Sequence, residues 1–323
     1  MKLPRRKFLQ LTLGAAVPPV ISRVARAQAY PTRPVRIVVA FAAGGAPDII
    51  ARIMAQRLSE RLGQQFIVEN RPGAASNIGT EIAVKAAPDG YTLLMVVGTN
   101  TINATLYSNL KFDFLRDIGP VASIGSTPFG MLVNQAFPAN TVPEFIAYAK
   151  TNPGKINMAS PGTGSHPHVV GELFKRMTSV DLVHIPYRGS YYPDLLSGQV
   201  QVAFSPMPSS TGYIQAGTLR ALAVTSATRS ADLPNIPTVS EFVPGYEALG
   251  WYGLGAPKDT PPAIIEKLNH EINAALADPT IKARLVALGA EPMPMTPVEF
   301  AKFMSDETEK WGRVVKFAGI RPD

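Results

Sequence analysis

The chain contains no cysteine among its 323 residues. This absence excludes disulfide bonds, thiolate catalysis and metal centres with cysteine ligands. Charged residues are also sparse, at 17% of the chain beside 46% hydrophobic residues, a composition typical of an ordinary globular protein. Since one hydrophobic core rarely organises more than about 250–300 residues, this length predicts more than one structural unit.

The first 29 residues contain no acidic residue but six basic ones. Removing these six from the 31 basic residues of the whole chain leaves 25 against 24 acidic residues. The formal charge of +7 is therefore a property of the N-terminus, and the rest of the chain is nearly neutral. A neutral body argues against nucleic acid as a partner.

Segment 1–29 has the three parts of an export signal. Residues 2–7 form a basic start, 8–21 an apolar stretch, and 27–29 (Ala-Gln-Ala) a small-residue cleavage site. The pair Arg5-Arg6 is typical of the twin-arginine export route. The apolar stretch is shorter than the ~20 residues of a membrane span, and two consecutive prolines interrupt it. We therefore expect export to the periplasm, with removal of the signal.

In the body of the chain, short apolar runs alternate with segments of helical periodicity. The first series predicts strands at 37–41, 66–68 and 91–97 and helices at 49–62 and 78–87, with loops at 71–77 and 98–101. A second series, which begins after Ser126-Thr127-Pro128, predicts strands at 131–133, 157–160, 182–187, 200–204 and 219–224. This alternation is typical of α/β proteins with parallel sheets.

The C-terminal part reads as mainly helical. It predicts helices at 261–277, 280–288 and 297–317 with one strand at 251–256, and the Thr296-x-x-Glu299 capping box opens the last helix. We expect it to pack back on the first unit. The predicted lobes are 30–127 plus 225–323, and 128–224, with a ligand cleft between them.

Four predicted loops at the carboxyl ends of strands are rich in small or polar residues, namely 42–48, 73–77, 98–101 and 160–165. Ligands of parallel sheets bind at this edge, where helix N-termini offer N–H groups and a partial positive charge. Taken alone, Gly44-Gly45 is typical of a tight corner and Asp48 of a helix cap. The recurrence of such loops predicts a site for an anion, most simply a carboxylate.

Motifs of common catalytic and cofactor sites are missing, including the P-loop, Gly-x-Gly-x-x-Gly, Gly-x-Ser-x-Gly and His-Glu-x-x-His. Ser165 precedes His166, but adjacent residues seldom face one another as nucleophile and base. His166, His168 and Glu172 do not have a recognised metal-ligand spacing. We expect no enzyme, no metal and no other cofactor; an exported serine hydrolase using Ser165 and His166 is the alternative from a different class.

Motifs spread over the whole mature chain are shared with one known family. They include GGAPD at 44–48, NRPGA at 70–74, NIG at 77–79, PDGYTL at 88–93, NATLY at 103–107, HIPYRG at 184–189, DLLSGQV at 194–200, LPNIPTV at 233–239 and PGYE at 244–247. On these motifs the chain resembles the Bug family, the periplasmic solute-binding components of tripartite tricarboxylate transporters.

The resemblance implies an α/β, two-lobed type II periplasmic-binding-protein fold and a monomeric receptor. Such a receptor passes a small organic carboxylate to membrane transporter subunits; a ligand sensor for a signalling partner is the alternative within the same fold. By position, the implied ligand contacts of lobe 1 are Phe41, Ala42, Gly44, Gly45, Ala46, Asp48, Ser76, Asn77, Thr99, Asn100 and Thr101. Those of lobe 2 are Ser160, Gly162, Thr163, Gly164, Ser165, His166, Tyr187, Arg188 and Ser205.

The chain departs from the family pattern at three places. Tyr191-Tyr192-Pro193-Asp194 replaces a longer stretch that often contains Ala-Pro-Ala-Leu, Ser205 replaces a frequent Asp, and Ala75-Ser76 replaces a frequent Gly pair. Added aromatic rings and a lost carboxylate favour a ligand that has a ring and lacks an amino group.

Overall fold

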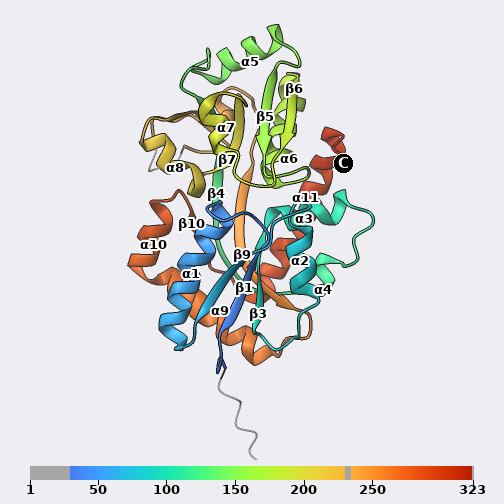
Figure 1. The fold of residues 1–323 in the computed structure, drawn as a ribbon, viewed down its shortest axis with the longest axis vertical. Coiled ribbons are helices and arrows are strands. Elements are labelled where there is room, and N and C mark those ends of the chain that lie inside the picture. Colours follow the sequence, from blue (N-terminus) through green and yellow to red (C-terminus); the bar gives the residue numbers. More distant parts are fainter. Residues whose placement is uncertain (1–29, 230–233, 322–323) are drawn as a thin grey trace, which may run out of the picture. The chain divides into compact units, whose positions relative to one another are not determined.

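The computed structural model describes residues 30–229 and 234–321 (Figure 1). The predicted export signal at 1–29 lies outside the described residues. Within them, no helix has both the length and the apolar character that a membrane crossing requires. The chain from residue 31 onward forms one structural unit, which holds all the strands and helices of the described residues.

The first sheet begins with three parallel strands, β1 (Val35–Val39), β2 (Phe66–Asn70) and β3 (Thr92–Val97), in the order β2-β1-β3. β9 (Leu249–Pro257) then pairs antiparallel with β3, and β4 (Ile118–Asn134) antiparallel with β9. The short strand β10 (Glu291–Pro292) pairs with β4. Helices α1 (Ala46–Leu62), α2 (Asn77–Val84), α4 (Phe114–Asp117), α9 (Pro262–Ala277) and α10 (Pro279–Val286) surround this sheet.

The second sheet starts from the far end of the same strand β4. Residues 129–134 of β4 pair antiparallel with β7 (Val202–Pro206) and β8 (Leu219–Val224), and β5 (Ile156–Ser160) pairs parallel with β7 and with β6 (Leu182–Pro186). The helices of this part are α5 (Val142–Thr151), α6 (His166–Thr178), α7 (Tyr192–Ser197) and α8 (Met207–Gln215) (Figure 1). One uninterrupted strand of 17 residues thus belongs to both sheets.

The C-terminal helix α11 (Pro297–Ala318) also contacts both parts. It packs against α3 (Gly98–Leu106) on one side and α6 on the other. The predicted capping box is present, with the Thr296 side chain accepting from the Glu299 N–H and the Glu299 carboxylate accepting from the Thr296 N–H. Trp311 of α11 is fully buried in the main core of the second part.

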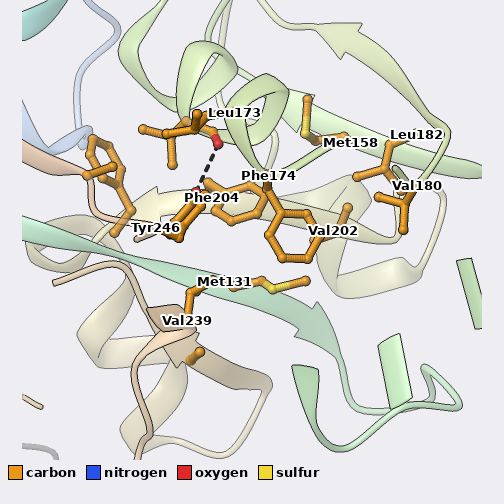
Figure 2. Close-up of a cluster of buried hydrophobic side chains, with 14 of the residues drawn as sticks. Met131, Met158, Leu173, Phe174, Val180, Leu182, Val202, Phe204, Val239 and Tyr246 are labelled. Carbon is orange, nitrogen blue, oxygen red and sulfur yellow. Dashed lines mark hydrogen bonds between the residues drawn. The ribbon is translucent and has the colours of Figure 1, made fainter. Parts of the chain in front are cut away.

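That core is built around the aromatic rings of α6 and β7. Figure 2 shows Phe174 and Phe204 at its centre. Their ring centroids are 5.5 Å apart, and the Tyr246 hydroxyl donates to the Val170 carbonyl over 2.9 Å. Because side chains alternate along a strand, Met131 of β4 faces this core while its neighbour Leu132 faces a second cluster. Burying each such side chain stabilises the fold by roughly 1.5–3 kcal/mol.

Several sequence expectations were wrong in detail. Residues 98–101, expected as a loop, begin helix α3, because the Asn100 side chain accepts from the Val97 N–H over 2.9 Å and stabilises the first turn. Residues 126–128, expected as a break, lie within β4. The central strands β9 and β4 are antiparallel to their neighbours, so the sheets are mixed. The sequence pattern did not predict α4, α7, α8, β10 or the 3₁₀ turn Val239–Glu241.

The predicted lobe boundaries near residues 128 and 225 stay a prediction, since β4 passes through the first without interruption. Hereafter lobe 1 denotes the part around the first sheet and lobe 2 the part around the second.

Candidate functional site

A cavity of about 600 Å³ lies where loops of lobe 1 and lobe 2 meet. This volume lies in the usual range for small-molecule sites, about 300–1,000 Å³. The loops approach closely, since a Cβ built on Gly162 of lobe 2 would lie 3.9 Å from the backbone N and Cα of Ala75 in lobe 1. The predicted cleft between small-residue loops is therefore present.

Twelve of the predicted site residues line this cavity. From lobe 1 they are Phe41, Ala42, Gly44, Gly45, Ala46, Ser76 and Thr99. From lobe 2 they are Gly162, Thr163, His166, Tyr187 and Arg188.

The other eight predicted residues are absent from the lining: Asp48, Asn77, Asn100, Thr101, Ser160, Gly164, Ser165 and Ser205. Each belongs to the layer behind the cavity wall, where its polar groups are used to hold the wall or are enclosed by it. They do not line the cavity, and a direct contact of these residues with a ligand stays a prediction.

Asp48 holds the first loop from behind. Its carboxylate accepts from the Gly44 N–H over 2.9 Å, from Asn70 Nδ2 over 3.0 Å and from Arg52 Nε over 3.0 Å. Burial alone would raise the pKa of Asp48, but these hydrogen bonds outweigh it and hold the pKa below its ordinary value. Gly44 has φ +79°, a conformation that favours glycine, so the corner needs this residue for its backbone.

Three consecutive residues after β2 adopt a left-handed backbone. Ala74, Ala75 and Ser76 have φ of 46°, 45° and 77°, and none is glycine. This conformation costs about 1–2 kcal/mol per residue with a Cβ. Strain of this kind persists where the surroundings enforce it, and it is typical of functional sites.

Side chains of lobe 1 enforce this turn by binding its carbonyl groups. Asn103 Nδ2 donates to the Ala75 carbonyl over 2.6 Å, and Thr80 Oγ1 donates to the Ser76 carbonyl over 2.9 Å. Asn103 also donates to Asn77 Oδ1 over 2.9 Å, and Asn100 Nδ2 to Thr80 Oγ1 over 2.8 Å. Asn77 and Asn100 therefore support the turn from behind. Asn103, which the site prediction omitted, is the most direct support.

The N–H groups of the same turn are not engaged. Among the described residues, no protein acceptor is found for the N–H of Ala74, Ala75 or Ser76. Successive N–H groups in a left-handed turn form a concave anion site, and α2, which starts at Asn77, adds the partial charge of its N-terminus. Ser76 Oγ accepts long hydrogen bonds from Asn100 and Asn103, at 3.5 and 3.4 Å, which leaves its own proton to donate.

In the facing loop of lobe 2, residues 160–166, several backbone N–H groups donate to acceptors of the protein. Gly162 N–H donates to Ser160 Oγ, Gly164 N–H to His168 Nδ1, and Ser165 N–H to the Gly162 carbonyl, at 3.2, 3.0 and 3.1 Å. These amides, expected from the sequence to meet a carboxylate, bind the protein itself in the structure.

His166 ends this loop as a neutral, buried ring. The backbone N–H of His166 donates to Thr99 Oγ1 of lobe 1 over 3.1 Å, and the ring lies edge-on to Trp311 and Phe129, at 4.3 and 5.0 Å between centroids. Burial, assisted by Lys310, lowers the pKa of His166 to about 3. In the described structure His166 Nε2 and Ser165 Oγ each lack a hydrogen-bond partner, so they do not form the pair that a serine hydrolase requires.

The other histidines of this region also support the loop. His184 Nε2 lies 2.6 Å from Ser160 Oγ, and its ring stacks on His168 at 3.7 Å. His168 Nε2 in turn lies 3.6 Å from the Glu172 carboxylate. His168 Nδ1 is occupied by the Gly164 N–H, and no group of three or more potential metal ligands occurs among the described residues.

Tyrosines line the lobe 2 side of the cavity. Tyr191, Tyr192 and Tyr213 stack in sequence, and Tyr187 stands edge-on to Tyr191. Ser205 lies behind them, fully buried, and is hydrogen-bonded to the hydroxyls of Tyr191 and Tyr192. Tyr213 is not among the residues expected from the sequence, and it sits on the unpredicted helix α8.

Arg188 is the only charged side chain that lines the cavity within the described chain. It is exposed, and none of the ion pairs within the described chain includes it. Its guanidinium therefore adds positive potential without a fixed counter-ion.

A family model described as "Tripartite tricarboxylate transporter family receptor" matches residues 50–320. The chain belongs to this receptor family. Among known relatives, BugT of Bordetella pertussis is 36% identical to the receptor over 315 residues, covering 96% of this chain and 95% of BugT.

Two solved structures resemble the receptor closely. Rpa4515 of R. palustris with adipate is 36% identical with a TM-score of 0.89, covering 91% of this chain and 100% of that one. MatC from Rhodopseudomonas palustris with bound malate is 31% identical with a TM-score of 0.84, covering 88% and 100%. These likenesses confirm the predicted family and the two-lobed α/β fold.

Proposed function

We propose that this receptor, exported to the periplasm, captures a small organic carboxylate and delivers it to the membrane subunits of a tripartite tricarboxylate transporter. The observation that carries the proposal is the left-handed turn at 74–76, whose three N–H groups point to no protein acceptor among the described residues. The bound adipate of Rpa4515 and the bound malate of MatC support a carboxylate as the ligand class.

In the proposed complex, one carboxylate accepts hydrogen bonds from the turn at 74–76 and from the Ser76 hydroxyl. Thr99 Oγ1 already accepts from His166, so its hydroxyl proton is available as a further donor. Hydrogen bonds from neutral donors to a charged acceptor contribute about 1.5–3 kcal/mol each. The single exposed guanidinium of Arg188 attracts the anion without forming a deep ion pair.

This arrangement favours a carboxylate over other charged ligands. A buried cation needs acidic partners, and among the described residues none lines the cavity. Phosphate groups usually recruit several Lys or Arg side chains, and here there is one.

The family is one of solute-binding receptors, and we propose a receptor without catalytic activity. The hydrolase alternative needs Ser165 at the ligand, but Ser165 is fully buried outside the lining. A sensor that passes the signal to another protein would use the same cavity, and the presence of transporter genes beside this one would distinguish the two roles.

The proposal is tested with the purified mature chain, by calorimetry and thermal unfolding, against aliphatic and aromatic mono-, di- and tricarboxylates. We expect saturable 1:1 binding by a monomer, a raised melting temperature, and no turnover of the corresponding methyl esters. Failure of every carboxylate to bind would refute the ligand class, and ester hydrolysis that Ser165→Ala abolishes would establish the hydrolase instead.

A further inference from the structure

We infer that the captured carboxylate carries an aromatic ring and no amino group. The inference rests on the proposed function and specifies the ligand of the same cavity. It follows from two properties of the wall opposite the turn at 74–76: its aromatic surface and its lack of negative charge.

The aromatic surface is a ladder of three tyrosines. Tyr191 and Tyr192 stack with ring centroids 4.9 Å apart and an angle of 26°, and Tyr192 and Tyr213 stack at 4.6 Å and 18°. Tyr187 adds an edge-on ring 6.2 Å from Tyr191. All four rings line the cavity.

The hydroxyls of the inner rings are already engaged away from a ligand. Tyr191 and Tyr192 bind Ser205 Oγ at 2.8 and 2.6 Å, and Tyr192 also donates to Ser209 Oγ over 2.9 Å. The Tyr187 hydroxyl donates to Asp194 over 2.5 Å. Tyr187, Tyr191 and Tyr192 therefore offer ring surface rather than hydrogen-bonding groups, and ring surface is best matched by another ring, stacked or edge-on.

Negative charge is missing from the same wall. None of the cavity-lining residues in the described chain is Asp or Glu. Of the two carboxylates nearest along the chain, Asp194 accepts from the Tyr187 hydroxyl and Asp48 accepts from Arg52, Asn70 and the Gly44 N–H, and neither lines the cavity. An ammonium group enclosed here would lose its hydration without gaining a counter-ion, which is strongly unfavourable.

A matched set of small acids tests both properties by calorimetry on the mature chain. 3-Phenylpropanoate and L-phenylalanine share a ring and a carboxylate and differ in the ammonium group. Hexanoate keeps the carboxylate but lacks the ring. We expect 3-phenylpropanoate to bind at least about 100-fold more tightly than L-phenylalanine and about 10-fold more tightly than hexanoate.

A pair of variants tests whether the preference for 3-phenylpropanoate over hexanoate depends on the tyrosine ladder. Tyr213→Leu keeps apolar volume on the half-buried α8 but removes the outer ring, so we expect the preference for 3-phenylpropanoate over hexanoate to fall about 5-fold. Tyr148→Leu removes a tyrosine of lobe 2 that packs on Phe137 outside the cavity, and the preference should be unchanged. Melting temperatures of both variants report whether the fold is intact.

The outcomes separate this inference from the proposed function. Equal affinities for 3-phenylpropanoate and L-phenylalanine would overturn the exclusion of amines. Hexanoate or adipate binding as tightly as 3-phenylpropanoate, or an unchanged preference in a folded Tyr213→Leu, would overturn the assignment of a ring. If none of these acids and no other carboxylate binds, the proposed function fails with it.

Discussion

The turn at 74–76 and the loop at 160–166 face one cavity from opposite lobes, and they differ in which half of the peptide group the protein uses. In the turn, side chains of lobe 1 bind the carbonyls of Ala75 and Ser76, while the N–H groups have no acceptor within the part of the chain that the structure describes. In the loop, protein acceptors take the N–H groups of Gly162, Gly164 and Ser165. A loop of small residues is therefore not sufficient for an anion site. Its backbone N–H groups must also lack acceptors within the protein.

The largest expected effect comes from the corner that precedes the turn in lobe 1. A Cβ on Gly45 would lie 3.3 Å from the Ala42 carbonyl oxygen, so Gly45→Val must open this corner at the cavity wall. We expect carboxylate affinity to fall at least about 100-fold, or ~2.7 kcal/mol, with the fold largely intact.

The matched control is Gly212→Val on α8, where a Cβ meets no atom within 4 Å and affinity should hold. Calorimetry measures the affinities and circular dichroism melts the stability. Unchanged affinity in Gly45→Val would remove this corner from the site.

A pair of serine variants compares the two loops directly. Ser76→Ala removes a hydroxyl at the cavity surface that donates to the proposed carboxylate, and should weaken binding about 10- to 100-fold, since such bonds contribute ~1.5–3 kcal/mol. Ser165→Ala removes a buried hydroxyl outside the lining and should change affinity less than about 2-fold. Titration calorimetry measures the affinities of both variants. A larger loss of affinity for Ser165→Ala than for Ser76→Ala would mean that the loop at 160–166, and not the turn at 74–76, binds the carboxylate.

His166 makes stability depend on pH. Its pKa is about 3 in the folded protein and about 6.5 when unfolded, so between these values the unfolded chain binds a proton that the folded chain does not. The free energy of unfolding should therefore fall as pH decreases from about 6.5, by up to ~1.4 kcal/mol per pH unit, with no contribution above this window.

His166→Gln should flatten this dependence, because glutamine has no titrating group. Urea unfolding of both proteins at pH 7, 6 and 5 measures the two slopes. Parallel slopes would mean that the His166 imidazole reaches solvent in the folded protein and is not buried at the end of the 160–166 loop.

The smallest effect is expected at Arg188. Because the guanidinium is exposed, Arg188→Gln should weaken binding only about 3- to 5-fold, ~1 kcal/mol or less, at low ionic strength. The difference should shrink further in 0.5 M salt, where the Debye length is only about 4–5 Å. A loss that is large and insensitive to salt would instead indicate a desolvated ion pair with the ligand.

The sequence predicted the elements whose signals are local. The helix at 46–62 ends at Gly63, with φ +70°, and the C-terminal helix begins at a capping box. By contrast, Gly98-Thr99-Asn100-Thr101 has the composition of a loop, and only the tertiary position of Asn100 and its partner Val97 makes it helical. Pro128 reads as a break because proline lacks an N–H, yet it falls where β4 passes from β9 to β7.

For the site, composition identified the loops but could not show their hydrogen bonds. Whether an amide of the 160–166 loop is available depends on Thr99 and His168, which approach it only in the folded chain. None of the three left-handed residues Ala74, Ala75 and Ser76 is glycine, so the usual sequence signal for that conformation is missing. The ladder partner Tyr213 lies on a helix that the pattern did not reveal.

In evolutionary terms, the shared strand β4 limits which changes of chain length the fold can accept. Its residues pair with β9 up to Pro128 and with β7 from Phe129. One residue inserted at this junction would turn each following side chain to the opposite face of the sheet. Met131 and Val133 would then leave the main core of lobe 2, and Leu132 would leave the second cluster. Insertions and deletions should therefore accumulate in loops that end within one lobe, while the length of β4 stays fixed and keeps both lobes in register.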